Sequence, residues 1–197
     1  MKPFSEACEQ NKLPILDVLR RYLTTPQVLL EIGSGTGQHA VFFAQQFPDI
    51  QWYATDIPAH LAGIQLWRDE YPGTNLHGPY ALDVNQAQWP LAQVDSIFSA
   101  NTTHIMHWPD VVAMFAGIGR VLKPHGFFLL YGPFMYDGLH TSHSNASFDQ
   151  FLQQRDPGSG IRDVTDLKHL ATEHGIRLVE DNAMPVNNRT LVWQKTY

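Results

Sequence analysis

Val28-Leu29-Leu30-Glu31-Ile32-Gly33-Ser34-Gly35-Thr36-Gly37-Gln38-His39 is the stretch of sequence that decides the fold. The apolar run over 28–32 suits a strand that is covered on both faces, as in a parallel sheet. Three glycines at alternate positions then allow a tight turn and a close approach of the backbone to a ligand. We expect Thr36 to cap a helix over 37–47, whose free N–H groups face an anionic ligand group.

Glu31 and the glycine spacing carry the first functional information. Glu31 stands at the carboxyl end of the predicted strand, which is where ligands bind in open α/β sheets. The glycine spacing is G-x-G-x-G, whereas the dinucleotide-binding pattern G-x-G-x-x-G requires a third glycine at the position of Gln38. A turn that only links a strand to a helix is the structural alternative.

Composition and charge narrow the class of protein. The chain has 197 residues, with 13 Lys and Arg against 19 Asp and Glu, and a net charge of −6. Because nucleic-acid binders cluster their cations and this chain has no basic run, we expect no nucleic-acid partner. No apolar window of about 18 residues exists, which predicts no membrane association. We expect a single domain over 1–197 and, with Cys8 as the only cysteine, a cytoplasmic location.

The remaining sequence alternates predicted strands and helices. Expected strands cover 28–32, 51–55, 76–82, 94–100, 127–131, 176–183 and 190–194, and expected helices cover 13–23, 37–47, 59–71, 109–122, 148–155 and 164–174. This alternation predicts an α/β fold with a seven-stranded, mostly parallel sheet and helices on both faces. Because the connection before the last strand is short, that strand is antiparallel, unlike the last strand of a dehydrogenase Rossmann domain.

Three local features complete the prediction of structure. Gly78-Pro79 indicates that the strand over 76–82 lies at an edge of the sheet. Pro14 suits the first turn of the first helix, where a missing N–H is tolerated. The segment 6–12 that precedes this helix is polar, and from composition alone we interpret it as a solvated leader. The long segment 132–147 follows a core strand and is expected to be a binding loop.

Two aspartates follow predicted strands, and each has two interpretations. Asp56 comes 25 residues after Glu31 at the end of the second strand, where a carboxylate can accept from both hydroxyls of a ribose. Pro58 follows two residues later, which fits a turn, so Asp56 could instead cap the following helix. Asp83 follows the third strand and could accept from the exocyclic amine of an adenine, or cap the polar turn over 85–88.

Candidate proton acceptors lie in the loops after the fourth and fifth strands. A general base, if the reaction needs one, is expected among His104, His107, His140, His143 and Tyr136. Histidine titrates near neutral pH and suits this task, although any one of ten histidines is more often an ordinary surface or hydrogen-bonded residue. The two His-x-x-His pairs could suggest a metal, but no cysteine or helical H-E-x-x-H accompanies them, so we expect no metal.

These motifs together resemble the class I S-adenosylmethionine (SAM) methyltransferases. Residues 31–37 match every fixed position of their glycine-rich loop, (Asp/Glu)-x-Gly-x-Gly-x-Gly, and 122–126 matches their Leu-Lys-Pro-Gly-Gly turn with His125 in place of the first glycine. The resemblance implies a single Rossmann-like class I methyltransferase domain with SAM as cofactor. It implies that SAM is bound by Glu31, Gly33, Ser34, Gly35, Gly37, Asp56, Ile57, Asp83, Val84, Asn101 and Thr102.

Further segments are similar to a small family of methyltransferase-like proteins whose function is uncharacterised. They are Ala7–Leu16, Ser34–Ala40, Ser144–Asp149, Arg155–Pro157, Gly160–Asp163 and Met184–Asn188. This resemblance covers nearly the whole chain and carries no substrate. It includes Asn11 and Lys12, which implies that the N-terminal segment 1–24 closes the site rather than being a solvated leader.

Candidate acceptor-binding residues are Asn11, Lys12, Phe134 and Arg162. Phe134, with Trp108, Met106 and Tyr136, could wall a pocket for an apolar acceptor, or could equally be core beneath the loop. Arg162 could hold an anionic acceptor, or pair with a nearby aspartate.

The resemblance implies a SAM-dependent methyltransferase that acts on a small-molecule acceptor by in-line transfer, as a monomer or homodimer. A macromolecular acceptor is less favoured because no basic patch exists. Methylation of an amine is also less favoured, because Ala100-Asn101-Thr102-Thr103 stands where amine methyltransferases have the motif Asp/Asn-Pro-Pro-(Tyr/Phe). A SAM-binding protein without catalysis, acting as a sensor or partner subunit, is the main alternative. An NAD-dependent oxidoreductase is disfavoured by Gln38 and by the final hairpin.

Overall fold

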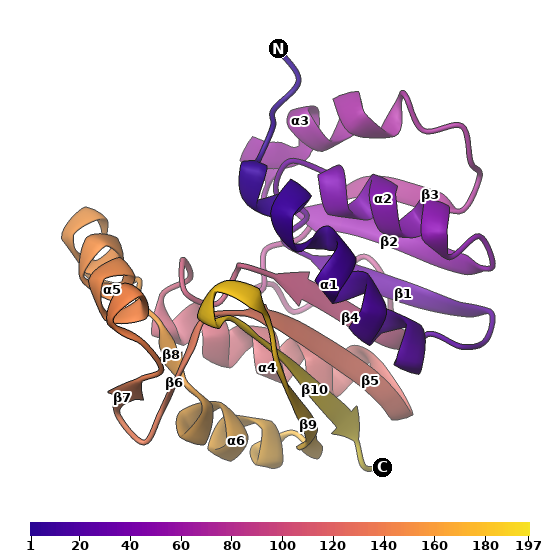
Figure 1. Cartoon of the computed structure of the whole chain (residues 1–197). Coiled ribbons are helices and arrows are strands. Elements are labelled where there is room, and N and C mark those ends of the chain that lie inside the picture. The colour runs from indigo at the N-terminus through magenta and orange to yellow at the C-terminus, as the bar shows by residue number, and fades with distance from the viewer.

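The structure is a computed structural model that describes residues 1–197, with one large sheet, flanking helices and a second, smaller sheet (Figure 1). The large sheet contains β1 (Gln27–Ile32), β2 (Ile50–Asp56), β3 (Leu76–Ala81), β4 (Val94–Ala100), β5 (Leu122–Gly132), β9 (Ile176–Ala183) and β10 (Arg189–Lys195). The helices are α1 (Glu6–Tyr22), α2 (Gln38–Gln46), α3 (Pro58–Arg68), α4 (Trp108–Val121), α5 (His143–Arg155) and α6 (Val164–Glu173), with a 3-10 turn η1 (Pro185–Asn187). The small sheet contains β6 (Phe134–Tyr136), β7 (Leu139–His140) and β8 (Arg162–Asp163).

The large sheet has the strand order β3-β2-β1-β4-β5-β10-β9. β1 pairs in parallel with β2 on one side and with β4 on the other, and β4 pairs in parallel with β5. β10 is antiparallel to both β5 and β9. The predicted seven-stranded, mostly parallel sheet with an antiparallel last strand is therefore confirmed, and β3 is an edge strand as Gly78-Pro79 indicated.

This strand order fixes where a ligand can bind. The chain runs from β1 outward to β3, then returns to the other side of β1 and continues through β4. Loops that leave the carboxyl ends of β1 and β4 therefore diverge, and a crevice opens between them. The glycine-rich turn after β1 and the segment 101–107 after β4 stand on its two sides.

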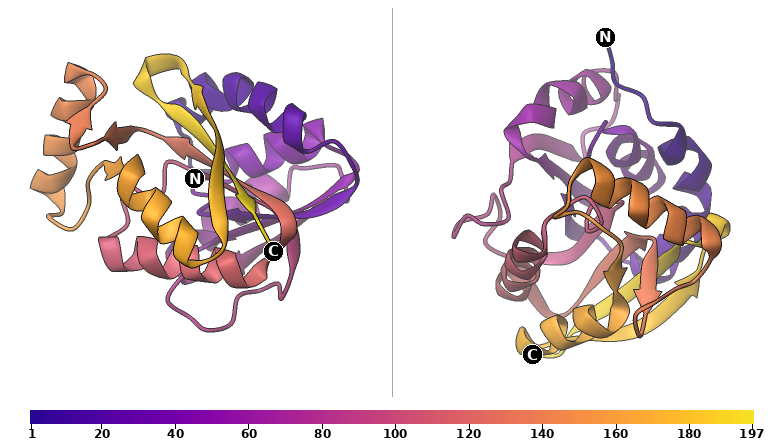
Figure 2. Two further views of the ribbon diagram at one scale, coloured as in Figure 1. Left: turned by 90° about the horizontal axis from the view of Figure 1, so that it is seen from below. Right: turned by 90° about the vertical axis from the view of Figure 1, so that its left-hand side faces the viewer.

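Two hydrophobic cores cover the two faces of the large sheet. Successive residues of β1 serve both, because Leu29 packs with α1, α2 and α3, while Leu30 packs with α4 and α6. On the first face, the Phe98 ring contacts Phe43 and Trp52 at centroid distances of 5.4 and 5.9 Å. Figure 2 shows the two helical layers and α5, which projects beyond them. This packing holds the strand ends that carry the site.

Helix α1 begins at Glu6, not at Leu13 as expected. The Ser5 hydroxyl caps it by accepting from the Cys8 N–H at 3.4 Å, and Glu6 and Glu9 favour its first turn. Pro14 consequently lies inside the helix rather than in its first turn. The apolar period starts only at 15, so the sequence pattern did not reveal the polar first half of the helix.

Helix α5 begins at His143, five residues before the expected 148, because the Ser142 hydroxyl accepts from the Asn145 N–H at 3.1 Å. The expected loop 132–147 also contains β6 and β7, which pair with β8 in the small sheet. Strands this short carry no readable alternation, so periodicity could not predict them.

The start of α2 also differs from the expectation. The residue at the N-cap is Gly37, with φ of +91° and no capping side chain, whereas Thr36 was expected there. The Thr36 hydroxyl still accepts from the Gln38 N–H at 3.3 Å. β5 begins at Leu122 rather than Phe127, so the expected turn 123–126 belongs to the strand. α3 ends at Arg68 rather than at 71.

Candidate active site

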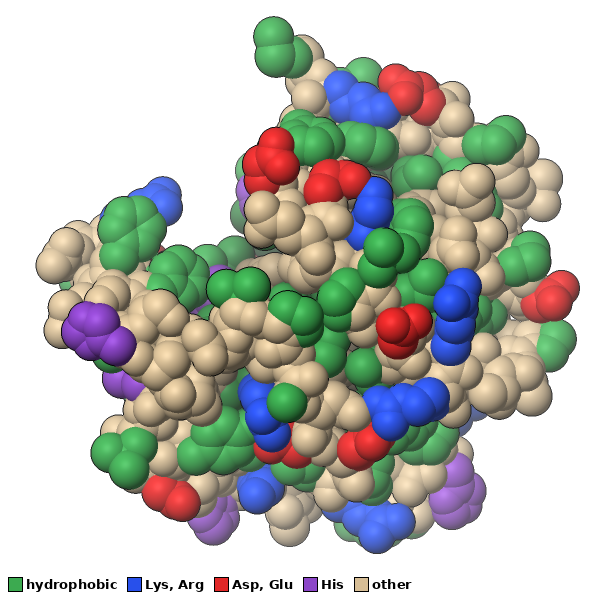
Figure 3. All heavy atoms as spheres, viewed as in Figure 1, with side chains coloured by type: hydrophobic (Ala, Val, Ile, Leu, Met, Phe, Trp, Pro, Cys, Tyr) green, Lys and Arg blue, Asp and Glu red, His purple; other side chains and the backbone are tan.

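A cavity of about 840 Å³ opens at the carboxyl ends of β1, β2, β4 and β5, in the crevice that the strand order predicts. Helices α1 and α5 and the turn η1 complete its walls. The space-filling view shows the surface hollowed between α5 and the N-terminal part of α1 (Figure 3). The 33 lining residues include aspartates and histidines but no Lys or Arg.

The glycine-rich turn forms one wall. The N–H groups of Gly33 and Ser34 donate to the Thr55 carbonyl oxygen at 3.0 and 2.9 Å, which ties the turn to the end of β2. Gly33 has φ of +73°, and a Cβ there would lie 2.4 Å from the Thr102 side chain. At Gly35, with φ of +59°, a Cβ would meet no atom within 4 Å, so the backbone is open to a ligand.

Gly37 has a different role from the first two glycines. It does not line the cavity. A Cβ at this position would lie 3.0 Å from the Ile64 Cα on α3, so its absence lets α2 and α3 pack closely. The predicted contact of Gly37 with the cofactor is therefore indirect, through the placement of the turn.

Asp56 lies at the cavity wall, so its binding of a ribose stays a prediction, while the predicted helix cap is not formed because the N-cap of α3 is Ile57 without a side-chain cap. Asp56 Oδ1 accepts from the Ile57 N–H at 2.7 Å and stands 2.8 Å from His60 Nδ1, at the start of α3. Its Oδ2 accepts from the Gly35 N–H at 2.7 Å. The carboxylate thus fixes the glycine-rich turn, and Oδ2 keeps one lone pair for a ligand.

Asp83 and its neighbour Val84 also line the cavity. Oδ1 of Asp83 accepts from the Asn85 N–H at 3.0 Å, as the turn-capping interpretation predicts. No protein group donates to Oδ2 of Asp83, so the same carboxylate has an acceptor for a ligand amine.

Glu31 does not reach the cavity. It is 1% exposed and accepts from the Trp52 indole N–H at 2.8 Å. Burial raises the pKa of Glu31 to about 7, with the Asp56 charge adding to the effect. The structure therefore places this acid beneath the turn and away from the cavity lining, whereas contact with the cofactor was predicted.

Asn101, Thr102 and His104 line the wall that follows β4. Asn101 adopts φ of +58°, and its N–H donates to the Tyr131 carbonyl oxygen at 2.9 Å, so the chain turns sharply into the cavity. His104 is 6% exposed, and its Nδ1 is buried without a hydrogen-bond partner. Burial lowers the pKa of His104 to about 4, with the Arg162 charge adding, so the ring is neutral at pH 7.

The other predicted bases lie outside the cavity. His107 Nε2 contacts Asp156 at 2.8 Å, and His140 Nε2 lies 3.4 Å from Asp149. The Tyr136 hydroxyl donates to Asp181 at 2.7 Å, and burial together with this carboxylate raises the pKa of Tyr136. His143 also does not line the cavity. We therefore retain only His104 as a candidate base.

Of the four predicted acceptor-binding residues, only Asn11 lines the cavity. Lys12 forms an ion pair with Glu9. Phe134 is fully buried in the core, as the alternative interpretation held. Arg162 donates to the carbonyl oxygens of Thr103 and Gly158 at 3.0 Å each, so it fixes two loops rather than binding a ligand.

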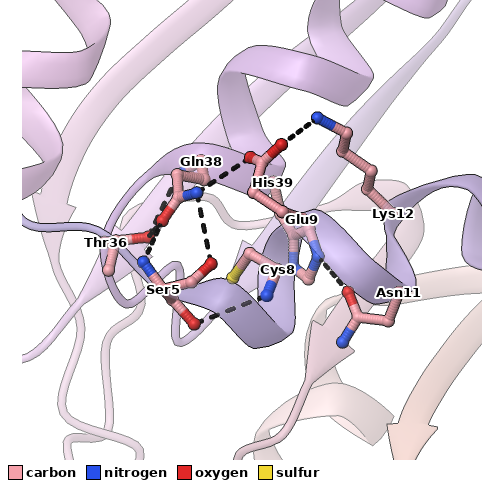
Figure 4. Close-up of polar contacts among 8 residues, drawn as sticks. All are labelled: Ser5, Cys8, Glu9, Asn11, Lys12, Thr36, Gln38 and His39. Atoms are coloured by element: carbon pink, nitrogen blue, oxygen red, sulfur yellow. Dashed lines mark hydrogen bonds and ion pairs between the residues drawn. The ribbon is translucent and has the colours of Figure 1, made fainter.

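Helix α1 is attached to the glycine-rich turn through Gln38, as Figure 4 shows. Gln38 Oε1 accepts from the Ser5 N–H at 2.6 Å, and Nε2 donates to the Ser5 carbonyl oxygen at 3.3 Å and to Glu9 at 2.9 Å. Further along α1, Asn11 Oδ1 lies 2.7 Å from His39 Nε2 on α2. These contacts bring Cys8 and Asn11 to the cavity wall. That 1–24 closes the site stays a prediction.

Sequence reasoning missed several residues that line the cavity. They are Cys8, His39, His60, Tyr131, Asn145, Phe148, Val186 and Asn188. Cys8, His39, Asn145, Phe148, Val186 and Asn188 belong to family-like segments, which was the available signal. Tyr131 ends a predicted core strand and therefore read as an ordinary buried residue.

Two further properties of the structure concern metal binding and membrane spanning. No group of three or more His, Cys, Asp or Glu side chains converges as a metal site would require. None of the helices is both long enough and apolar enough to cross a membrane.

Known proteins share this architecture. An O-methyltransferase family protein from Burkholderia thailandensis superposes with a TM-score of 0.81 at 13% identity, over 94% of this chain and 56% of that chain. The fold is therefore the Rossmann-like fold of class I SAM-dependent methyltransferases, as the sequence predicted. Residues 2–195 match the family described as "Protein of unknown function (DUF938)", and the chain belongs to this family.

Two curated methyltransferases are similar in sequence. Malonyl-(acyl-carrier protein) O-methyltransferase of Xylella fastidiosa (strain M23) is 30% identical over 131 residues, which cover 64% of this chain and 41% of that protein. C-methyltransferase NovU of Streptomyces niveus is 24% identical over 185 residues, which cover 92% of this chain and 40% of that protein. The chain spans about two fifths of the length of each of these relatives.

Proposed function

We propose that this chain is a SAM-dependent methyltransferase that transfers a methyl group to a small-molecule acceptor. The observation that carries the proposal is a single cavity that joins the glycine-rich turn and two acids to His104. Its volume of about 840 Å³ is within the range of about 300–1,000 Å³ of small-molecule sites. The relatives that share the fold are methyltransferases, which supports the same assignment.

We call one part of the cavity the cofactor end, and it is formed by 33–36, Asp56, Ile57, Asp83 and Val84. Its carboxylates and its open backbone are groups that could hold SAM. Asp56 Oδ2 would accept from a ribose hydroxyl, and Asp83 Oδ2 from the adenine amine. The open backbone at Gly35 would admit the methionyl part. Ile57, Leu82 and Val84 supply apolar surface for the adenine ring.

SAM, when bound, supplies an electrophilic methyl group on a sulfonium. The protein's own tasks are to hold an acceptor in line with that group and to take up the proton that the acceptor loses. His104 is the candidate for the second task, because its neutral ring lines the cavity. Helices α1 and α5 stand on two sides of the open site.

A SAM-binding protein without catalysis is the second candidate function. It is favoured by the fact that four of the five predicted bases point away from the cavity. In that case SAM binds but no methyl group is transferred, and helix α1 would signal occupancy of the site to a partner.

Two measurements test these proposals. Calorimetry with SAM, S-adenosylhomocysteine and NAD tests the cofactor, and binding of NAD without binding of SAM would reject both functions. Transfer of labelled methyl groups from SAM into a small-molecule cell extract then separates a transferase from a binding protein. Asp56→Ala, which removes a carboxylate of the cofactor end, is the negative control for transfer.

A further inference from the structure

The part of the cavity beyond His104 is built from amides and one phenol. It contains Asn11 from α1, Tyr131 from β5, Asn145 from α5 and Asn188 from the segment after η1. We call these four residues the amide cluster. They come from elements far apart in the sequence, so their meeting at one wall is a property of the fold.

Contacts within and beside the cluster position its members. Asn11 and Asn188 both lie near the Tyr131 hydroxyl and lower the Tyr131 pKa, against the larger, raising effect of burial. The Asn145 side chain donates to the Asn187 carbonyl oxygen at 3.0 Å. All four residues line the same cavity and present polar groups to it.

His104 adjoins this surface. Its ring contacts Phe148 edge to face at 5.5 Å between centroids, and Phe148 lies three residues after Asn145 on α5. A Cβ added at Gly132, the residue after Tyr131, would lie 3.8 Å from His104 Nδ1. His104 and the amide cluster line the same cavity, so a molecule held by the cluster would share that cavity with the candidate base.

Asn145 is oriented by its neighbours. Its Nδ2 donates to Thr141 Oγ1 and to the Asn187 carbonyl oxygen, both at 3.0 Å, which uses both amide hydrogens. Its Oδ1 has no donor in the protein, although the residue is only 6% exposed and lines the cavity. Asn145 thus presents a fixed hydrogen-bond acceptor.

Asn11 and Tyr131 provide donors. Asn11 Oδ1 faces His39 Nε2 at 2.7 Å, which leaves the Nδ2 amide to face Tyr131. Tyr131 is 3% exposed and its raised pKa keeps the hydroxyl protonated at neutral pH. Both residues line the cavity, so a ligand there meets donors as well as the acceptor of Asn145.

No full charge of either sign belongs to this part of the cavity. The nearby cations are used elsewhere: Lys12 pairs with Glu9, Arg162 binds loop carbonyls, and Arg189 pairs with Asp181 at 2.7 Å. The three lining carboxylates, Asp56, Asp83 and Asp110, follow β2 and β3 or begin α4. An anion would lose its hydration here without a cation to replace it, and a cation would lose it without a carboxylate.

We propose that the acceptor is an uncharged molecule, held by the amide cluster through a polar group that both donates and accepts. This deepens the proposed function and rests on it. In the transfer, the bond between the acceptor atom and the methyl group forms as the methyl–sulfur bond of SAM breaks, and the proton that the acceptor atom carried passes to His104. The walls formed by Met106, Phe148 and Val186 fit an apolar part of the same molecule.

Charge fractionation of the acceptor pool tests this inference. A small-molecule cell extract is separated at pH 7 by ion exchange into anionic, cationic and neutral pools, and each is incubated with the protein and methyl-labelled SAM. We expect labelled product from the neutral pool. Product from only the anionic or cationic pool would overturn the inference while leaving the transferase intact. No product from any pool, with SAM binding retained, would reject the transferase and this inference with it.

Two matched variants on α5 test the cluster directly. Asn145→Asp is isosteric and adds a negative charge at the cavity wall, whereas Gln150→Glu adds the same charge on an exposed residue outside the cavity. We expect Asn145→Asp to lower transfer to the neutral pool by at least about tenfold with unchanged SAM affinity, and Gln150→Glu to have no effect. Melting curves confirm that both variants are folded. Full transfer by folded Asn145→Asp would overturn the role of the cluster.

Discussion

Gln38 forms a two-way amide contact with Ser5: its Oε1 accepts from the Ser5 N–H at 2.6 Å, and its Nε2 donates to the Ser5 carbonyl oxygen at 3.3 Å. Gln38 is the residue that stands where a dinucleotide-binding loop would have its third glycine. The side chain that departs from that pattern is therefore the one that attaches helix α1 to the glycine-rich turn (Figure 4).

Gln38→Ala should release the start of α1. The side chain is 3% exposed and its loss leaves the Ser5 N–H without a partner, which costs about 1–3 kcal/mol of stability. We expect faster hydrogen exchange over residues 5–12 and weaker SAM binding. Gln45→Ala, on the exposed side of α2, is the matched control and should change neither. Unaltered exchange in Gln38→Ala would show that the core contacts of α1 suffice to hold it.

Asp56→Ala should weaken SAM binding at least about tenfold, which corresponds to about 1.4 kcal/mol. The carboxylate both faces the cavity and holds the Gly35 N–H at 2.7 Å, so its removal affects the ligand contact and the turn together. Calorimetry measures the affinity, and exposed Asp69→Ala at the end of α3 is the control. Equal affinities in the two variants would defeat the assignment of Asp56.

The sequence predicted the framework of this site better than its contents. Strand β4 and the turn after β1 follow from local patterns, since an apolar run and a glycine spacing are readable along the chain. The amide cluster does not follow, because Asn11, Asn145 and Asn188 meet only through packing of α1, α5 and the hairpin. Short or partly polar helices lack a clear hydrophobic periodicity, so the sequence does not show which of their polar residues face the cavity.

The predicted bases show the same limit. His107 and His140 were chosen because they follow core strands, and both do lie near that edge of the sheet. Each one, however, is turned toward an aspartate from a later segment, Asp156 or Asp149. Which histidine faces the cavity depends on these long-range partners, and no local pattern records them.

Glu31→Gln should stabilise the protein at alkaline pH. The pKa of Glu31 is raised from an ordinary value of 4.5 to about 7 by burial. A raised pKa in the folded state means that the stabilising contribution of the neutral form is complete below pH 4.5 and is lost as pH rises through about 7.

The glutamine variant keeps an acceptor for the Trp52 indole and does not ionise. Its free energy of unfolding, measured in urea, should therefore exceed that of the parent by a margin that grows by about 3 kcal/mol between pH 4 and pH 8. A constant difference across this range would show that Glu31 ionises as freely in the folded protein as in the unfolded chain.

His104→Asn should lower the rate of methyl transfer by about 10²-fold or more while SAM affinity stays unchanged, because the ring acts on the acceptor proton and not on the cofactor. His107→Asn is the matched control, since His107 pairs with Asp156 outside the cavity and this variant should retain full activity.

The pH profile of methyl transfer gives a second readout of the role of His104. A base must be neutral to accept a proton, and the His104 pKa is lowered to about 4, so activity should persist through pH 6 and fall only as pH approaches 4. An acid limb near pH 6.5 that is shared by the parent and by His104→Asn would instead show that a group other than His104 controls the pH dependence.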